Sequence, residues 1–196
     1  MVIGNFENKR LFIAVELPVS VRKTVHQLGC RVLANCNDPR PVKAANIHIT
    51  LKFLGNVPGD DLDQINEAIS IAISPFNIFS FVIDGNIDAF PNKKRARTIF
   101  MAIGEGRLEL KRLYLSLEEC LGRICKGFDI KRSPNDFMAH ITIARLRHTQ
   151  DITNAIKKAG TIMPIRIECG KIALFESALD PAGVRYTKLR EFSIKA

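Results

Sequence analysis

Two copies of a His-Ile-Thr phrase most restrict how this 196-residue chain can fold. One copy is His48-Ile-Thr50 and the other is His140-Ile-Thr142, and each lies in an apolar, β-branched run typical of a strand. Successive side chains of a strand point to opposite faces, so the His and Thr of one copy share a face. Each copy therefore predicts an imidazole and a hydroxyl side by side on a rigid strand.

The two copies lie 92 residues apart, close to half the chain length, and a helical pattern accompanies each. This spacing predicts a duplicated strand–helix–strand unit, diverged in sequence. Two such strands facing one another would line a cleft with two acid–base groups, which suits a phosphate attacked on one side and losing an alcohol on the other. The other two histidines, His26 and His148, lack this context and are expected to face solvent.

Hydrophobic periodicity predicts a loose alternation of strands and helices along the chain. The expected strands are 10–17, 47–55, 79–90, 97–103, 137–146, 165–175 and 185–194. The expected helices are 19–34, 60–74, 106–126 and 151–159. The polar stretch 35–46, with Pro39 and Pro41, predicts a loop.

Charge favours an anionic partner. The chain has 29 Lys and Arg against 20 Asp and Glu, a net charge of +9, and such a surplus concentrates polyanions near a protein. The basic residues are dispersed apart from a cluster at 93–97, expected to be a solvated loop. Charge alone does not distinguish RNA from a nucleotide or a membrane surface.

Composition predicts an ordinary globular protein, with 46% apolar and 25% charged residues. The sequence contains no apolar stretch of 18 residues and its first ten residues lack a signal-peptide pattern, so we expect a cytoplasmic location. The five cysteines are odd in number and form no C-x-x-C pair, which indicates reduced, structural thiols.

Two other kinds of site fit the sequence poorly. A zinc or iron site usually gathers three or more His, Cys or carboxylate ligands, whereas each phrase offers one. A hydrolase nucleophile elbow, G-x-S-x-G, and a Gly-rich phosphate loop are both absent from the sequence. The remaining candidate is therefore acid–base chemistry at the paired His and Thr side chains, without a metal or cofactor.

The sequence resembles the two-histidine phosphoesterase superfamily, which two H-x-[ST]-x motifs define. Within it, the chain is most similar to the bacterial and archaeal RNA 2′,3′-cyclic phosphodiesterases, historically called 2′-5′ RNA ligases. The matching segments are 10–18, 48–55, 140–145 and 175–192. The resemblance implies an α+β fold of two pseudo-symmetric lobes, each an antiparallel sheet with helices on its outer face, enclosing a central cleft. It implies one domain, 1–196, of two intertwined lobes with one motif each, 48–51 and 140–143.

The resemblance also implies a role for each candidate residue. His48 would be the proton donor, His140 the proton acceptor, and Thr50 and Thr142 would bind the non-bridging phosphate oxygens. Arg145 would bind phosphate too, although strict alternation places it on the face opposite His140, so it must bend into the cleft. The implied reaction hydrolyses RNA 2′,3′-cyclic phosphate ends to 2′-phosphomonoesters in a monomer, with 2′-5′ ligation as its reverse.

Two alternatives remain open at this stage. One is a cyclic phosphodiesterase of the same superfamily that acts on cyclic nucleotides or ADP-ribose-type cyclic phosphates. The other is a non-catalytic module that binds RNA or a nucleotide. The chain also departs from the family pattern, because relatives often carry an aromatic residue shortly before the first motif, where this chain has 40–46 and no Trp. If that aromatic residue stacks on a base in the relatives, base contacts here must differ or be weaker.

Overall fold

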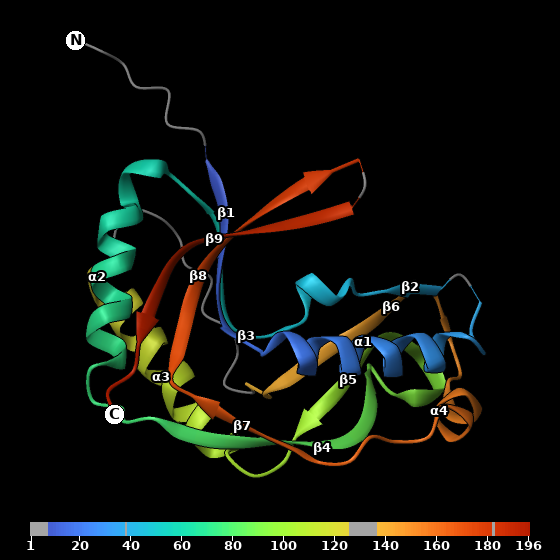
Figure 1. Ribbon diagram of the computed structural model, residues 1–196. Coiled ribbons are helices and arrows are strands. Elements are labelled where there is room, and N and C mark those ends of the chain that lie inside the picture. Colours follow the sequence, from blue (N-terminus) through green and yellow to red (C-terminus); the bar gives the residue numbers. More distant parts are fainter. Residues whose placement is uncertain (1–7, 38, 126–136, 182) are drawn as a thin grey trace.

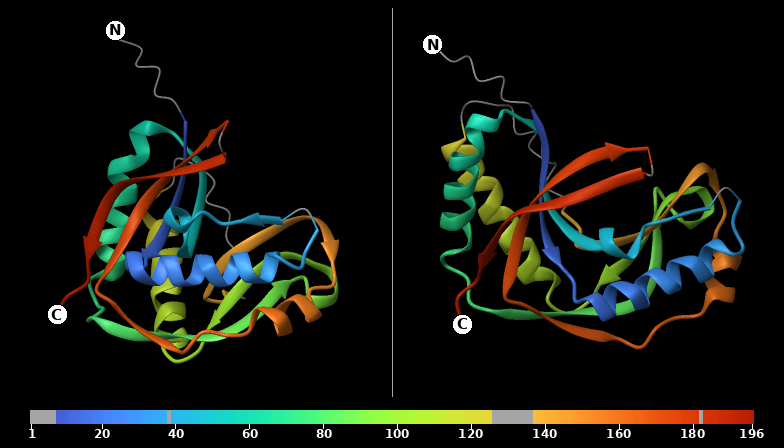
Figure 2. Two further views of the ribbon diagram at one scale, coloured as in Figure 1. Left: turned by 45° about the vertical axis from the view of Figure 1, so that its right-hand side comes forward. Right: turned by 45° about the horizontal axis from the view of Figure 1, so that its top comes forward.

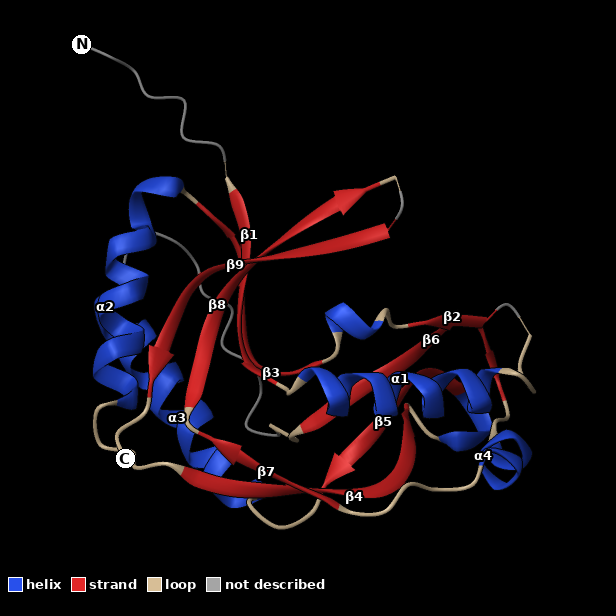
Figure 3. Ribbon diagram, in the orientation of Figure 1, coloured by secondary structure: helices blue, strands red, loops and turns tan. Residues whose placement is uncertain are grey.

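The chain folds as an α+β protein whose strands form a large antiparallel sheet (Figures 1 and 3). The computed structural model describes residues 8–37, 39–125, 137–181 and 183–196. The strands are β1 (Lys9–Glu16), β2 (Pro39–Pro41), β3 (His48–Val57), β4 (Phe79–Phe90), β5 (Ala96–Ile103), β6 (His140–Gln150), β7 (Ile165–Cys169), β8 (Lys171–Asp180) and β9 (Gly183–Ser193). The α-helices are α1 (Val19–Leu33), α2 (Leu62–Ile73), α3 (Arg107–Ile124) and α4 (Thr153–Ala159).

The order of the strands divides the sheet into two lobes. The order is β7-β4-β5-β6-β3-β1-β8-β9. The short strand β2 also pairs with β6, on the edge opposite β5 and beyond the point where β3 pairs. We call β3, β1, β8 and β9 the first lobe, and β6, β5, β4 and β7 the second. The lobes meet where β3 and β6 pair at Ile49 and Ile141. The two strands that carry the His-Ile-Thr phrases are therefore neighbours at the centre of the sheet.

The helices are exchanged between the lobes. Helix α1 follows β1 of the first lobe but contacts β2, β6 and α4, whereas α3 follows β5 of the second lobe but contacts β3 and α2 (Figures 1 and 2). The expected two-lobed α+β architecture is confirmed. The repeat is not two contiguous strand–helix–strand units, however, because each lobe is covered by helices from both halves of the chain.

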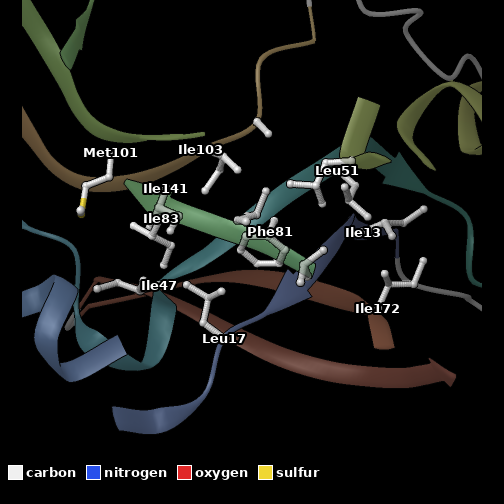
Figure 4. Close-up of a cluster of buried hydrophobic side chains, with 14 of the residues drawn as sticks. Ile13, Leu17, Ile47, Leu51, Phe81, Ile83, Met101, Ile103, Ile141 and Ile172 are labelled. Atoms are coloured by element: carbon white, nitrogen blue, oxygen red, sulfur yellow. The ribbon is translucent and has the colours of Figure 1, made fainter. Parts of the chain in front are cut away.

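The hydrophobic core runs through both lobes. Helix α2 buries residues at helical spacing, from Ile65 through Ile69 to Ile73, as the apolar stripe of an amphipathic helix requires. Figure 4 shows side chains of both lobes packed in one cluster around Phe81. The core therefore fixes the two lobes against each other and holds β3 beside β6.

Three local expectations were wrong. The stretch 35–46 contains β2 and a 3₁₀ turn at Ala44–Asn46, since the backbone of β2 pairs with β6. The expected strand 165–175 is two strands, β7 and β8, with Gly170 between them. His26 does not simply face solvent, since it is half-buried and its Nδ1 lies 2.8 Å from the carbonyl oxygen of Val42.

The basic cluster 93–97, expected to be a solvated loop, is a 3₁₀ turn at Lys93–Arg95 followed by the first residues of β5. Other expectations concern the cysteines, the membrane and the end of one helix. All five cysteines are free, and three of them are buried. Within the described ranges, no helix has the length and apolar character needed to span a membrane. The end of the expected helix 106–126 falls at 126, outside the described residues, and α3 ends at Ile124.

Candidate active site

A cavity of about 240 Å³ contains every residue that the sequence singled out for chemistry. Its lining comes from both lobes. The lining residues are Val42, Asn46, His48, Thr50, Phe53, Phe90, Thr98, His140, Thr142, Arg145 and Tyr186. A larger hollow of about 420 Å³ lies beside the start of α1 and is lined by Glu16, Arg22 and Lys171 among others, but it contains no histidine. The acid–base groups identify the smaller cavity as the candidate site.

The pairing of β3 with β6 relates the two motifs by an approximate two-fold axis. Ile49 lies opposite Ile141, and both isoleucines are fully buried. The flanking His and Thr side chains point the other way, into the cavity, as strand alternation requires. The predicted sharing of one face by His and Thr in each motif is confirmed.

Both imidazoles are held in the same way, each by a hydrogen bond from Nδ1 to the backbone carbonyl two residues earlier. Nδ1 of His48 lies 2.8 Å from the carbonyl oxygen of Asn46, and Nδ1 of His140 lies 2.8 Å from that of Met138. A carbonyl oxygen only accepts, so each Nδ1 carries a proton and donates it. In the neutral ring Nε2 is then the free base, and Nε2 of His48 accepts from the Thr50 hydroxyl at 2.9 Å. Nε2 is therefore the nitrogen of each histidine that is available for proton transfer.

Aromatic side chains pack against each imidazole. In the first lobe, the rings of Phe12 and Tyr186 have centroids 5.0 and 5.4 Å from that of His48. In the second lobe, Phe90 and Phe100 lie 5.4 and 5.3 Å from His140, both edge-on. These contacts limit the rotation of the imidazole rings. Catalysis by a positioned acid or base requires such a limit.

Burial and neighbouring positive charge lower the pKa of both imidazoles. Burial lowers the pKa of His48 to about 4, the hydrogen bond to Asn46 opposes this, and the charges of His140 and Arg145 lower it further. Burial also lowers the pKa of His140, with the charge of Arg145 adding to the effect. A bound anion would favour the imidazolium form and so raise both pKa values again.

A β-bulge brings Arg145 into the cavity. Phe100 pairs with Thr142 and Ile99 with Ala144, so Ile143 is an extra residue on β6. Ile143 and Ala144 are both buried, and Arg145 emerges on the cavity side, where its guanidinium donates to the Thr98 hydroxyl at 3.2 Å. Strict alternation, which places Arg145 on the opposite face, is therefore wrong here.

Helix α1 supports this bulge. The carbonyl of Ile143 accepts a hydrogen bond from the backbone NH of Val42 at 3.0 Å. A Cβ atom on Gly29 of α1 would lie 3.0 Å from the same carbonyl oxygen, closer than ordinary contact allows. The absence of a side chain at Gly29 lets the helix lie directly on the bulge and fix its shape.

Sequence reasoning missed six lining residues, among them Phe53, Phe90, Thr98 and Tyr186. These four come from β3, β4, β5 and β9, and only the pairing of the strands brings them together, whereas Val42 and Asn46 lie between β2 and β3. Tyr186 and Phe53 fall inside segments that resemble the family, but no pattern in the sequence assigns them to the site.

Comparison with known proteins agrees with this geometry. Residues 17–181 match the model of the 2′-5′ RNA ligase superfamily. The chain is 34% identical over 185 residues to an RNA 2′,3′-cyclic phosphodiesterase of Archaeoglobus fulgidus, which covers 93% of this chain and 99% of the relative. It is 27% identical over 182 residues to that of Thermotoga maritima, covering 93% and 94% of the two chains.

Solved structures share the fold. The crystal structure of TT0787 of Thermus thermophilus aligns with a TM-score of 0.76 and 27% identity, covering 95% of this chain and 98% of that one. Escherichia coli LigT, solved in complex with 3′-AMP, aligns with a TM-score of 0.73 and 22% identity, covering 97% and 99%. Two His-Ile-Thr strands meet in one cavity, and the family model matches most of the chain. The chain therefore belongs to the 2′-5′ RNA ligase superfamily.

Proposed function

We propose that this protein hydrolyses 2′,3′-cyclic phosphate ends of RNA to 2′-phosphomonoesters by acid–base catalysis between His48 and His140. The observation that carries the proposal is the cavity itself, in which each lobe supplies one imidazole and one threonine. Opening a cyclic phosphate needs a base on one side of phosphorus and an acid on the other, and one histidine per lobe matches that need.

The proposed reaction is an in-line displacement. Neutral His140 accepts a proton from water through Nε2 while the water oxygen bonds to phosphorus. The bond from phosphorus to O3′ breaks, and protonated His48 gives its Nε2 proton to the leaving O3′. Thr50, Thr142 and Arg145 donate hydrogen bonds to the non-bridging oxygens, where negative charge accumulates. The Thr50 hydroxyl donates to Nε2 of His48, so it must turn to phosphate when substrate binds.

The relatives support the class of substrate. Those of A. fulgidus and T. maritima are named RNA 2′,3′-cyclic phosphodiesterases, and LigT has been solved with 3′-AMP and with phosphate. The net charge of +9 suits a nucleotide or RNA ligand. We further propose that the chain works as one domain and as a monomer, since both halves of the site come from a single copy. A cytoplasmic location is part of the same proposal.

One substrate panel tests the proposal. Purified protein in EDTA is incubated with an oligonucleotide ending in a 2′,3′-cyclic phosphate, a cyclic mononucleotide and an ADP-ribose-type cyclic phosphate. We expect turnover of the RNA end to a 2′-phosphate. Turnover of the other substrates alone would assign a different activity of the superfamily, and binding without turnover would indicate a binding module.

The lowered pKa values predict how activity depends on pH. The free enzyme needs one protonated and one neutral histidine, and both pKa values lie below 6.5. As pH rises above them the acid is lost, and as pH falls below them the base is lost, so kcat/KM should peak below pH 6.5. Bound phosphate favours the imidazolium and raises both pKa values, so the optimum of kcat should lie at higher pH than that of kcat/KM.

Steady-state rates measured from about pH 4 to 9 on the cyclic-phosphate oligonucleotide give both profiles. Coinciding optima at neutral pH would contradict the assignment of the two titrating groups.

A further inference from the structure

A second arginine lies directly opposite Arg145. Strand β2 pairs with β6 so that Arg40 faces Arg145, while Thr98 lies opposite Arg145 on the β5 side (Figure 1). Residues that lie opposite one another on antiparallel strands share a face, so Arg40 belongs to the same row. Val42, two residues after Arg40, lines the cavity, and strand alternation gives these two side chains the same face. Arg40 therefore lies on the cavity side of β2.

The arginine pair is a feature of the second lobe. Strand β3 has a bulge like that of β6, with Leu51 as its extra residue. The residue two positions beyond the bulge is Phe53 in β3 and Arg145 in β6. The first lobe thus has an apolar side chain where the second lobe has a guanidinium group. An anion held between two guanidinium groups therefore belongs to the second lobe.

The charges of Arg40 and Arg145 repel each other. Like charges directly opposite on neighbouring strands destabilise a sheet. Arg40 is exposed and forms no ion pair with any residue that the structure describes. An exposed arginine on an edge strand is ordinary, because charge keeps such an edge from pairing with another chain. Arg40 differs because its partner across the strands is also an arginine, and an anion between the two would remove the repulsion.

The reacting phosphate is not the anion that suits Arg40. Arg145 lines the cavity, whereas Arg40 does not. The charge of Arg145 lowers the pKa of both His48 and His140, and Arg40 is not among the charges that shift them. Arg40 therefore lies farther from the histidines than Arg145 does, at the rim of the cavity. An anion beside it belongs to a part of the ligand that extends out of the cavity.

We propose that Arg40 binds the phosphodiester on O5′ of the terminal nucleotide of an RNA strand. This step rests on the proposed function, which places the cyclic phosphate between the two histidines. The phosphodiester on O5′ is the next anion along the strand, and a nucleoside 2′,3′-cyclic phosphate lacks it. A guanidinium group binds phosphate oxygens through a fixed pair of N–H donors. Arg40 thus makes the enzyme prefer an RNA end to a cyclic mononucleotide.

Two substrates with the same reacting end test this preference. One is adenosine 2′,3′-cyclic phosphate with a free 5′ hydroxyl, and the other is a dinucleotide that carries this end on a phosphodiester. Arg40→Gln should raise KM for the dinucleotide at least about fivefold and leave its kcat and both constants of the mononucleotide unchanged. Its Tm should equal or exceed that of the wild-type protein, because the repulsion with Arg145 is removed. Arg112→Gln, at an exposed arginine of α3 outside the cavity, removes the same charge and should change neither substrate's KM.

Binding without turnover separates this proposal from the proposed function. The same mononucleotide and dinucleotide, each ending in a 2′-phosphate, are titrated calorimetrically into the wild-type protein and Arg40→Gln at several salt concentrations. We expect the variant to lose affinity for the dinucleotide alone, and its slope of log K against log salt to fall by about 0.7, the share of one phosphate of a single strand.

Three results of the titration would overturn the proposal. Equal losses for both ligands would place Arg40 at the terminal phosphate. No loss for either would leave it an ordinary charge of an edge strand. A wild-type protein that binds the dinucleotide no more tightly than the mononucleotide would have no such subsite. If the wild-type protein turns over neither cyclic phosphate, the proposed function fails while the titration still decides the role of Arg40.

Discussion

His48→Ala and His140→Ala should each lower kcat/KM for a cyclic-phosphate oligonucleotide by at least ~100-fold, the usual contribution of a positioned acid or base. Each variant removes the Nε2 that transfers a proton and leaves the other histidine in place. The loss should be similar in both, because the leaving oxygen and the attacking water each need a proton partner. Initial rates measured in EDTA provide the comparison.

His148→Ala is the matched control for these variants. His148 lies on β6 as His140 does, but it is exposed and does not line the cavity. Its replacement should leave the rate unchanged. Thermal unfolding of all three variants separates loss of chemistry from loss of structure, since His48 and His140 also pack against aromatic rings. Activity close to wild type in either active-site variant would reject the proposed roles.

The sequence predicted the two motifs correctly because strand alternation is local. Period two places His and Thr on one face whatever the rest of the fold does, and β3 and β6 both behave this way. The same rule fails three residues beyond each histidine, where a bulge shifts the alternation by one residue. Without strand pairing, Arg145 could be assigned to the cavity only by family resemblance, and Phe53 was not identified at all.

The parts of the site that depend on long-range pairing were beyond sequence reasoning. Thr98 reaches Arg145 across the β5–β6 pairing, and Tyr186 reaches His48 from β9 near the end of the chain. The exchange of helices between the lobes also depends on long-range contacts that the sequence pattern does not reveal. Periodicity identifies the apolar stripe of α3 but does not say which lobe the stripe covers.

Glu118→Leu should destabilise the protein by about 3–5 kcal/mol, because it removes the carboxylate that faces a fully buried ammonium group. Lys52 lies on β3 beside the bulge residue Leu51, and its side chain is 0% exposed. Its Nζ pairs with Oε1 of Glu118, which lies on α3. This ion pair joins the bulge of the first lobe to α3, the helix that follows β5 of the second lobe in the chain. A loss of this size lowers Tm by about 6–20 °C in a chain of this length, which calorimetry measures readily.

The order of the related variants distinguishes a buried ion pair from simple packing. Lys52→Met should cost less than Glu118→Leu, because the side chain of Glu118 is 17% exposed whereas that of Lys52 is 0% exposed, so the charge left behind is less deeply buried. The double variant Lys52→Met with Glu118→Leu should recover most of the stability, since it leaves neither charge without its partner. Losses that simply add in the double variant would show that the two charges do not depend on each other.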